Sequence, residues 1–398
     1  MKWPMVKLGE LATHIRNGVS IKQSPDAGGL KITRIETIAE RKVNLNKCGY
    51  AGLTENDYMD FRLKKGDILI SHINSESHLG KCAIFEEERN DIIHGMNLLS
   101  FRTNRKVEPK YLYYALSSDS FLMKLKKITK KSVNQASFNV TSFKELDIPL
   151  PPLEEQKRIA EIMDKADVIR QKRQQAIALA DDFLRSVFLD MFGDPVTNPK
   201  GWAVKPLGKD IIHANNGLAR RRKEEDNVGD IVLRLQDVQY DGINFDKDLN
   251  RITLDKKEKE RYQVDIGDIL FIRVNGNPNY VGRSTIFNGH VEDVYHNDHI
   301  IRLKVSSSFE PKFLSFVFNS NGGRKIIAKK TKTSAGQHTI SQAGIEELEI
   351  YRPPLEKQKS FVRIMNALMP IIENNFKSDG INLGLFAVLS QKAFSGHL

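Results

Sequence analysis

The chain of 398 residues repeats itself once, and this duplication limits the possible folds more than any other feature. Short signals recur at an offset of about 200 residues, which is too long for a solenoid repeat of roughly 20–50 residues. The offset fits a domain and connector that occur twice. The clearest signals are Trp3 and Trp202, Gly66-Asp67-Ile68-Leu69 and Gly267-Asp268-Ile269-Leu270, Gly80-Lys81 and Gly282-Arg283, and Pro151-Pro152-Leu153-Glu154 and Pro353-Pro354-Leu355-Glu356.

Each copy begins with short apolar runs that are broken by Gly, Asn and Asp, which is typical of short strands. One helical stretch follows, near residues 111–126 in the first copy and 313–325 in the second. A Pro-Pro pair then ends the last strand, because proline cannot donate a hydrogen bond to a sheet. We therefore expect an α+β protein with two homologous mixed α/β domains, residues 1–150 and 196–352.

Long helices follow both Pro-Pro pairs, in connectors at residues 151–195 and 353–398. The first is predicted from Leu153 to Phe192, with apolar residues mostly three or four apart, as in a coiled-coil seam. We favour pairing with the second helix over packing against its own domain alone. The second helix contains Pro370, Gly380 and Gly384, which predict two pieces rather than one rod.

Composition narrows the class of protein further. The net charge is +11, which favours a polyanionic partner because bound phosphates release their counterions. No run approaches the ~20 apolar residues of a membrane span, so we expect a cytoplasmic protein. Two cysteines, Cys48 and Cys82, are too few for a disulfide framework or a zinc site.

Signatures of catalysis are missing from the sequence. It contains no phosphate-binding loop, no dinucleotide fingerprint and no Asn-Pro-Pro-aromatic tetrapeptide of an aminomethyltransferase. His94 and His296 recur at matched positions without a recurring nucleophile, so we interpret them as structural or polar-contact residues. We predict no catalytic residue, no metal ligand and no cofactor bound by this chain.

DNA contacts are predicted in three places. A basic stretch recurs before each Pro-Pro pair, where Lys, Thr and Ser suit phosphate oxygens and Gln suits an adenine edge; a merely solvated surface is the alternative. The loop after each Gly-Asp-Ile-Leu strand differs between the copies, as expected of specificity loops on a shared scaffold. An arginine run is found in the second copy alone, and it fits a phosphate site or an exposed turn equally.

The candidates in the basic stretches are Lys127, Thr129, Lys130, Lys131, Asn134, Gln135, Lys329, Lys330, Lys332, Gln337 and His338. The candidates in the loops and the arginine run are His72, Asn74, Lys81, Arg273, Asn275, Asn277, Arg283, Arg220, Arg221 and Arg222.

The layout resembles the specificity subunits of type I restriction–modification enzymes. The resemblance rests on the two Pro-Pro-Leu-Glu signals with their following Gln156 and Gln358, the Gly-Asp-Ile-Leu strands and the terminal Ala393-Phe394-Ser395-Gly396. It implies two target recognition domains that read the halves of a split, asymmetric site in double-stranded DNA. It further implies that the two helices form an antiparallel coiled coil, which would return the end of the chain to the first domain.

The resemblance also implies partners. Modification subunits, two of them, would dock on the helices and bind S-adenosylmethionine, with restriction subunits beyond them. Two other functions remain open at this point. One is a helical scaffold whose two heads bind protein, and the other is an enzyme fused to a recognition unit, which the missing methyltransferase motifs disfavour.

Overall fold

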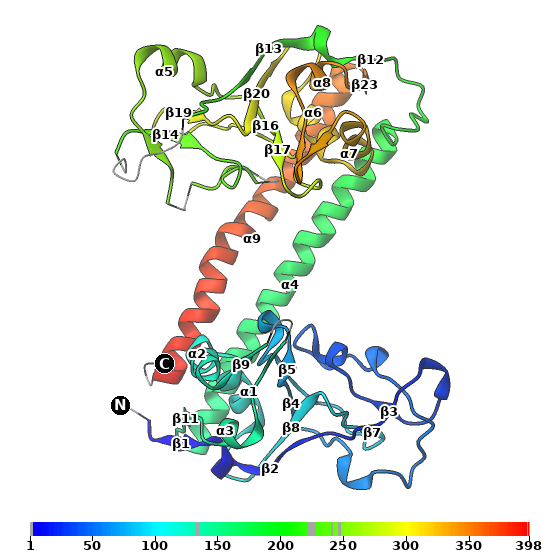
Figure 1. Cartoon of the computed structure of the whole chain (residues 1–398), viewed down its shortest axis with the longest axis vertical. Coiled ribbons are helices and arrows are strands. Elements are labelled where there is room, and N and C mark those ends of the chain that lie inside the picture. Colours follow the sequence, from blue (N-terminus) through cyan, green and yellow to red (C-terminus); the bar gives the residue numbers. More distant parts are fainter. Residues whose placement is uncertain are drawn as a thin grey trace. The chain divides into compact units, whose positions relative to one another are not determined.

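The computed structural model describes residues 3–132, 135–220, 228–239, 242–245, 248–395 and 397 (Figure 1). The chain divides into two units, one made of Met1–Gln175 with Asn374–Leu398 and the other of Ala176–Glu373. Each unit therefore contains part of both long helices, α4 (Leu153–Phe192) and α9 (Leu355–Ser395).

The first unit is built on a four-stranded antiparallel sheet in the order β2-β8-β4-β6. Helix α1 packs against β6, and α2 packs against α1. Its elements before α4 are β1 (Met5–Lys7), β2 (Ala12–Asn17), β3 (Lys31–Ile32), β4 (Ile68–Ser71), β5 (Ile73–Asn74), β6 (Cys82–Ile84), β7 (Ile92–Ile93), β8 (Leu98–Thr103), α1 (Pro109–Ser117), α2 (Asp119–Ile128), β9 (Lys130–Lys131), β10 (Ala136–Ser137), α3 (Val140–Lys144) and β11 (Asp147–Pro149).

The second unit repeats this plan, with a four-stranded antiparallel sheet in the order β13-β20-β16-β18. Helix α6 packs against β18, as α1 does against β6. Its elements before α9 are β12 (Val204–Pro206), β13 (Ile211–Asn216), β14 (Asp230–Leu233), β15 (Arg251–Ile252), α5 (Lys256–Tyr262), β16 (Ile269–Ile272), β17 (Val274–Asn275), β18 (Ser284–Ile286), β19 (Val294–His296), β20 (Ile300–Val305), α6 (Pro311–Asn319), α7 (Asn321–Ala328), β21 (Lys332–Ser334), β22 (Gln337–Thr339), α8 (Gln342–Glu346) and β23 (Glu349–Tyr351). The shared strand order agrees with the duplication read from the sequence.

The repeated Gly-Asp-Ile-Leu signal marks the start of a central strand, β4 or β16. The Asp67 carboxylate accepts a hydrogen bond from the backbone N–H of Lys64 at 2.8 Å and pairs with Arg102 at 2.7 Å. Asp268 and Arg302 form the equivalent pair at 3.7 Å. The aspartate therefore closes the turn before the strand and is neutralised by an arginine on the neighbouring strand.

The predicted single helical stretch in each copy is two helices, and the prediction was wrong in this detail. Ser118 separates α1 from α2 with an extended backbone, and its hydroxyl accepts a hydrogen bond from the N–H of Phe121 at 3.3 Å. Ser320 does the same between α6 and α7 for Gly323, at 3.1 Å. A serine N-cap stabilises a new helix start at the point where the apolar pattern continues.

The start of each long helix is fixed by a buried glutamine from the Pro-Pro-Leu-Glu signal. The side-chain carbonyl of Gln156 accepts from the N–H of Glu108 at 2.8 Å, and its amide donates to the carbonyl of Pro151 at 2.8 Å. Gln358 makes the same two bonds with Glu310 and Pro353, at 2.9 and 2.8 Å. The signal therefore recurs because it joins the helix to the segment before α1 or α6.

Helix α4 begins and ends where the sequence predicted, and its two ends lie in different cores. Ile159 and Met163 near its start belong to the core of the first unit. Phe188 and Phe192 near its end belong to the core of the second, with ring centroids 5.6 and 5.7 Å from that of Phe361.

The predicted break in the second helix is wrong, because α9 is one helix through Pro370, Gly380 and Gly384. Its end lies in the core of the first unit, where Ala393 is buried and the Phe394 ring lies 5.5 Å from that of Tyr111. Packing at both ends of a helix stabilises it against the local cost of proline and glycine. The return of the last helix to the first unit is confirmed.

We predict that Phe188→Ala destabilises the second unit by roughly 3–5 kcal/mol, because it leaves a cavity among stacked aromatic rings. The matched control is Leu189→Ala, since Leu189 is 49% exposed and Phe188 is 1% exposed. The control should change the free energy of unfolding by less than about 1 kcal/mol. Urea denaturation of both variants measures the difference, and equal losses would contradict this packing.

Candidate nucleic-acid interface

The basic stretch and the variable loop, predicted as two separate DNA contacts, lie together in one small sheet in each unit. In the first unit the three strands have the order β5-β10-β9, so Ala136 lies opposite Asn74 on one side and Lys131 on the other. In the second the order is β17-β22-β21, and His338 lies between Asn275 and Thr333. We call this the reading sheet of each unit.

A glycine allows the variable loop to approach the basic helix in both units. Gly80 has a φ of +76°, and a Cβ there would lie 2.4 Å from Leu125 on α2. Gly282 has a φ of +81°, and a Cβ there would lie 2.7 Å from Ile327 on α7. Glycine is favoured at such positions because it has no side chain and tolerates a positive φ.

A tight turn links β21 to β22 and places Gln337 at the start of its strand. The two linking residues, Ala335 and Gly336, have φ values of +47° and +75°. Positive φ at both central residues is the pattern of a type I′ hairpin turn. Gln337 is exposed there, and Gln135, the residue before β10, is exposed as well. The predicted contact Asn134 lies outside the described residues.

Two of the three candidate lysines in each basic stretch are exposed and make no ion pair with any residue that the structure describes. They are Lys127 and Lys130 in the first unit, and Lys329 and Lys332 in the second. All four come from the recurring motif Lys-x-Thr-Lys. Their charges are available for phosphates.

The neighbouring lysines are paired instead. Lys131 contacts Glu76 at 2.7 Å, and Lys330 contacts Glu347 at 2.7 Å. The hydrogen bond from each lysine lowers the pKa of its carboxyl partner. These two lysines are therefore less available to DNA phosphates than the four unpaired ones.

The motif threonine ends a helix. The Thr129 hydroxyl donates to the carbonyl of Leu125 at 2.8 Å, and the Thr331 hydroxyl donates to that of Ile327 at 3.0 Å. Each threonine thereby satisfies a carbonyl of the last turn of α2 or α7. Its recurrence has this local cause, which the sequence analysis missed.

Three other candidates are held by the protein itself. The ring of His72 is buried beside Phe138, and burial lowers its pKa to about 4. Lys81 donates to the carbonyl of Ala39 at 3.3 Å. Arg273 donates to the carbonyl of Asp298 at 2.9 Å. The structure does not place the His72 ring on the surface, contrary to our prediction of a DNA contact there.

The loop asparagines shape their own loops. The side-chain oxygens of Asn74, Asn275 and Asn277 accept hydrogen bonds from backbone N–H groups one or two residues later, at 2.8, 2.9 and 3.0 Å. Such bonds are typical of Asx turns. In the next turn, the guanidinium of Arg283 lies 4.2 Å from the ring centre of Tyr280.

The arginine run is only partly described. Arg220 pairs with Glu258 at 3.0 Å and donates to the carbonyl of Thr253 at 2.7 Å, so it anchors its own segment to α5. The predicted contacts Arg221 and Arg222 lie outside the described residues.

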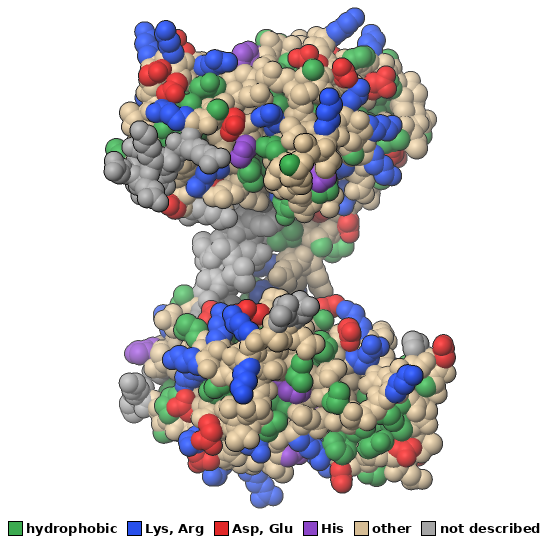
Figure 2. All heavy atoms as spheres, in the orientation of Figure 1, with side chains coloured by type: hydrophobic (Ala, Val, Ile, Leu, Met, Phe, Trp, Pro, Cys, Tyr) green, Lys and Arg blue, Asp and Glu red, His purple; other side chains and the backbone are tan. Residues whose placement is uncertain are grey.

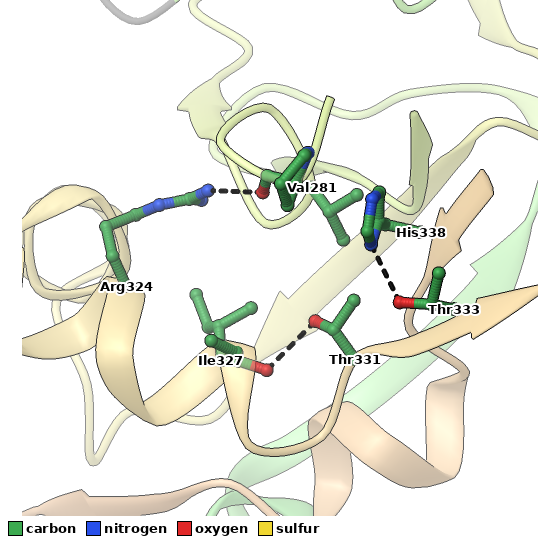
Figure 3. Close-up of a pocket in the computed structure, with 8 residues that line it drawn as sticks. Val281, Arg324, Ile327, Thr331, Thr333 and His338 are labelled. Carbon is green, nitrogen blue, oxygen red and sulfur yellow. Dashed lines mark hydrogen bonds between the residues drawn. The ribbon is translucent and has the colours of Figure 1, made fainter. Parts of the chain in front are cut away.

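Beside the reading sheet of the second unit lies a surface pocket of about 130 Å³ (Figure 3). The Thr333 hydroxyl and His338 Nδ1, 2.9 Å apart, form a hydrogen bond at its edge. Arg324 on α7 donates to the carbonyls of Pro278 and Asn279. The lining residues are Pro278, Val281, Arg324, Ile327, Ala328, Thr331, Thr333 and His338.

Comparison with known proteins decides the family. The family model described as "Type I restriction modification DNA specificity domain" matches residues 1–179 and 199–379, once for each copy. The chain belongs to this family. It is the DNA specificity subunit of a type I restriction–modification system.

Individual relatives agree with this assignment. A putative type I restriction enzyme MjaX specificity subunit from Methanocaldococcus jannaschii is 32% identical over 93% of this chain and 88% of the relative. The StySPI specificity subunit from Salmonella potsdam is 31% identical over 75% of this chain and 67% of the relative. The crystal structure of a type I S subunit from M. genitalium has the same fold, with a TM-score of 0.63, 15% identity and coverage of 98% and 96%.

The assignment removes the two alternatives that the sequence left open. Specificity subunits are non-catalytic, which excludes a fused enzyme. Their role is DNA specificity, which excludes a scaffold whose two heads bind only protein. No helix within the described residues is long and apolar enough to cross a membrane. On the face drawn in Figure 2, Lys and Arg side chains are interspersed with acidic ones, so net charge alone does not locate the DNA interface.

The recurring histidines of the specificity subunit are buried. His94 is 1% exposed and His296 is 0% exposed. Burial lowers the pKa of His94 to about 3 and that of His296 to about 4. Both rings are neutral at pH 7 and belong to the cores, so their recurrence reflects folding.

These lowered pKa values predict that the subunit loses stability in acid. The unfolded chain takes up a proton on each histidine near pH 6.5, whereas the folded chain does so only near pH 3–4. Unfolding therefore becomes easier as pH falls from about 6.5 towards 4, by up to ~1.4 kcal/mol per pH unit for each histidine.

Urea unfolding of wild type and His296→Asn between pH 7.5 and 5 tests this pH dependence. The variant should lose stability less steeply with falling pH than wild type does. His299→Asn is the control, because the side chain of His299 is 46% exposed. Equal slopes for wild type and His296→Asn would contradict the interpretation.

Proposed function

We propose that the subunit reads a two-part, asymmetric site in double-stranded DNA, with one half-site read by each reading sheet. Residues 1–150 and 196–352 would act as the two target recognition domains, and residues 151–195 and 353–398 as the helical spacers between them. The proposal rests chiefly on one observation: in each unit, a short sheet joins a variable loop to an exposed, unpaired lysine, Lys130 in the first unit and Lys332 in the second.

Phosphate contacts position a protein on DNA, and base contacts specify sequence. The exposed lysines at shared positions, such as Lys130 and Lys332, suit the first task in both units. Side chains that differ between the units, such as Lys131 and Thr333, suit the second. An asymmetric site requires two units that share a scaffold but differ in the side chains that contact the bases.

The long helices would pair as an antiparallel coiled coil that sets the gap between the half-sites. In support, each unit contains the start of one helix and the end of the other. A helix of 40 residues measures about 60 Å at ~1.5 Å per residue.

Two modification subunits would dock on these helices and bind S-adenosylmethionine, with restriction subunits beyond them, in the cytoplasm. Exposed apolar side chains on α4 support a protein-binding role for the helix. They are Val168, Ile169, Leu179, Phe183 and Leu189.

The exposed lysines should contribute affinity rather than sequence choice. Replacing Lys127 and Lys130 with alanine should weaken binding to all duplexes, because phosphates are the same in every sequence. Each lost phosphate contact should also reduce the slope of log K against log salt by about one unit. Lys330→Ala is the control, since that lysine is paired with Glu347. Binding of the full complex across a salt series measures the slope, and an unchanged slope would assign the two lysines to plain solvated surface.

Exchanging residues 1–150 for the corresponding domain of another specificity subunit should change one half-site only. The other half-site and the gap should stay the same, because the second unit and both helices are retained. A genome-wide map of methylated bases, before and after the exchange, measures both halves at once. A change in both half-sites, or in the gap, would contradict separate reading by two domains.

A further inference from the structure

The pocket beside the second reading sheet is specific to that unit in its chemistry. Ile327 and Val281 form its floor, and the first unit also has apolar residues, Leu125 and Leu79, at the matching positions. Its rim uses positions that differ. The register of the two reading sheets aligns Thr333 with Lys131.

The same register aligns His338 with Ala136, and the position of Ala328 on α7 corresponds to that of Lys126 on α2. In the first unit this region carries charge: Lys131 pairs with Glu76, and both Lys131 and Lys126 lower the pKa of that carboxyl. In the second unit, the corresponding positions hold a methyl group, a hydroxyl and an imidazole.

The size and lining of the pocket restrict its occupant. A volume of about 130 Å³ corresponds to about four water molecules at ~30 Å³ each. Cofactor and drug-sized pockets are larger, at roughly 300–1,000 Å³. The pocket therefore fits a small apolar group with a polar edge beside it.

The pocket opens at the protein surface beside Lys329 and Lys332, the two lysines that we propose to bind phosphate. Ala328 and Thr333 on its rim are exposed, and the exposed Lys329 and Lys332 each neighbour a rim residue in sequence. A small apolar group that DNA presents in its major groove is the C5-methyl group of thymine, which alanine and threonine methyls contact in other complexes.

The hydrogen bond to Thr333 fixes the imidazole of His338 at the edge of the pocket (Figure 3). This hydrogen bond occupies Nδ1 of His338, so Nε2 is the ring nitrogen that remains to hydrogen-bond a base edge. The structure describes no other hydrogen bond of this ring. A pocket with an aliphatic floor and polar side chains at its edge is suited to reading one base and its exocyclic edge.

From this geometry we infer that the pocket of the second unit receives the C5-methyl group of one thymine in its half-site, with His338 at the edge of the same or the adjacent base. The inference rests on the proposed function, because it assumes that the second reading sheet faces DNA.

The test begins from the methylation map, which gives the half-site of the second unit. Each thymine of that half-site is replaced singly by deoxyuridine, which lacks only the methyl group. Binding by the complete complex should weaken roughly four- to tenfold at one of these positions, as expected for one buried methyl group. A half-site without thymine, or equal binding of every substituted duplex, would overturn the inference.

Two variants then connect that thymine to the pocket. Ala328→Leu fills the pocket, and Ala328→Lys introduces the residue that the first unit carries there, so either variant should bind thymine and deoxyuridine duplexes equally. The control is Lys126→Leu, the matched position in the first unit, which should leave this discrimination intact. Retained discrimination in a folded Ala328 variant would overturn the assignment to the pocket.

These outcomes are distinct from failure of the proposed function. If the inference alone is wrong, the complex still binds its two-part site with steep salt dependence while the thymine methyl has no effect. If the proposed function is wrong, exchange of residues 1–150 fails to change a single half-site, whatever the deoxyuridine duplexes show.

Discussion

The aromatic cluster at the end of α4 is the interaction on which the organisation of the chain depends. Helix α4 begins in the first unit, and its residues Phe188 and Phe192 complete the core of the second, where they contact Phe313 and Phe361. The last turn of α9 does the same for the first unit. Each core is therefore incomplete without a helix that starts in the other half of the chain, so neither half is an independent domain in the strict sense.

The repeated signals fix this arrangement, and most of them act through folding. Gln156 and Gln358 are buried and join the long helices to the segments before α1 and α6. Gly80 and Gly282 allow a loop to pack on a helix. These residues recur because both copies need the same backbone geometry. Recurrence within a duplicated chain therefore identifies the scaffold first, and a recurring polar residue needs structural evidence before it is assigned to DNA.

The sequence predicted what depends on local pattern. The bounds of α4 follow from the proline pair and from Gly193, and the sheet order of one copy implies that of the other. It could not predict the reading sheet, because its strands are only two or three residues long and are paired across some sixty residues. The sequence also did not indicate that the His72 ring is buried beside Phe138, because this burial depends on tertiary packing. Pro370 led to the wrong prediction of a broken helix, because local helix propensity does not include the packing that stabilises both ends of α9.

The two reading sheets match at the residue that we propose to bind phosphate and differ at the residue beside it. Lys130 and Lys332 occupy the same register position, are both exposed and are suited to phosphates, which are the same in every sequence. One residue along, Lys131 is held by Glu76 in one unit, while Thr333 holds His338 in the other. In the proposed complex, a charged pair and a neutral pair would present different donors and acceptors to a base edge from the same backbone position. Under the proposed function, the two tasks would belong to adjacent residues of one strand, so the two copies could recognise different sequences while both keep the lysine that binds phosphate.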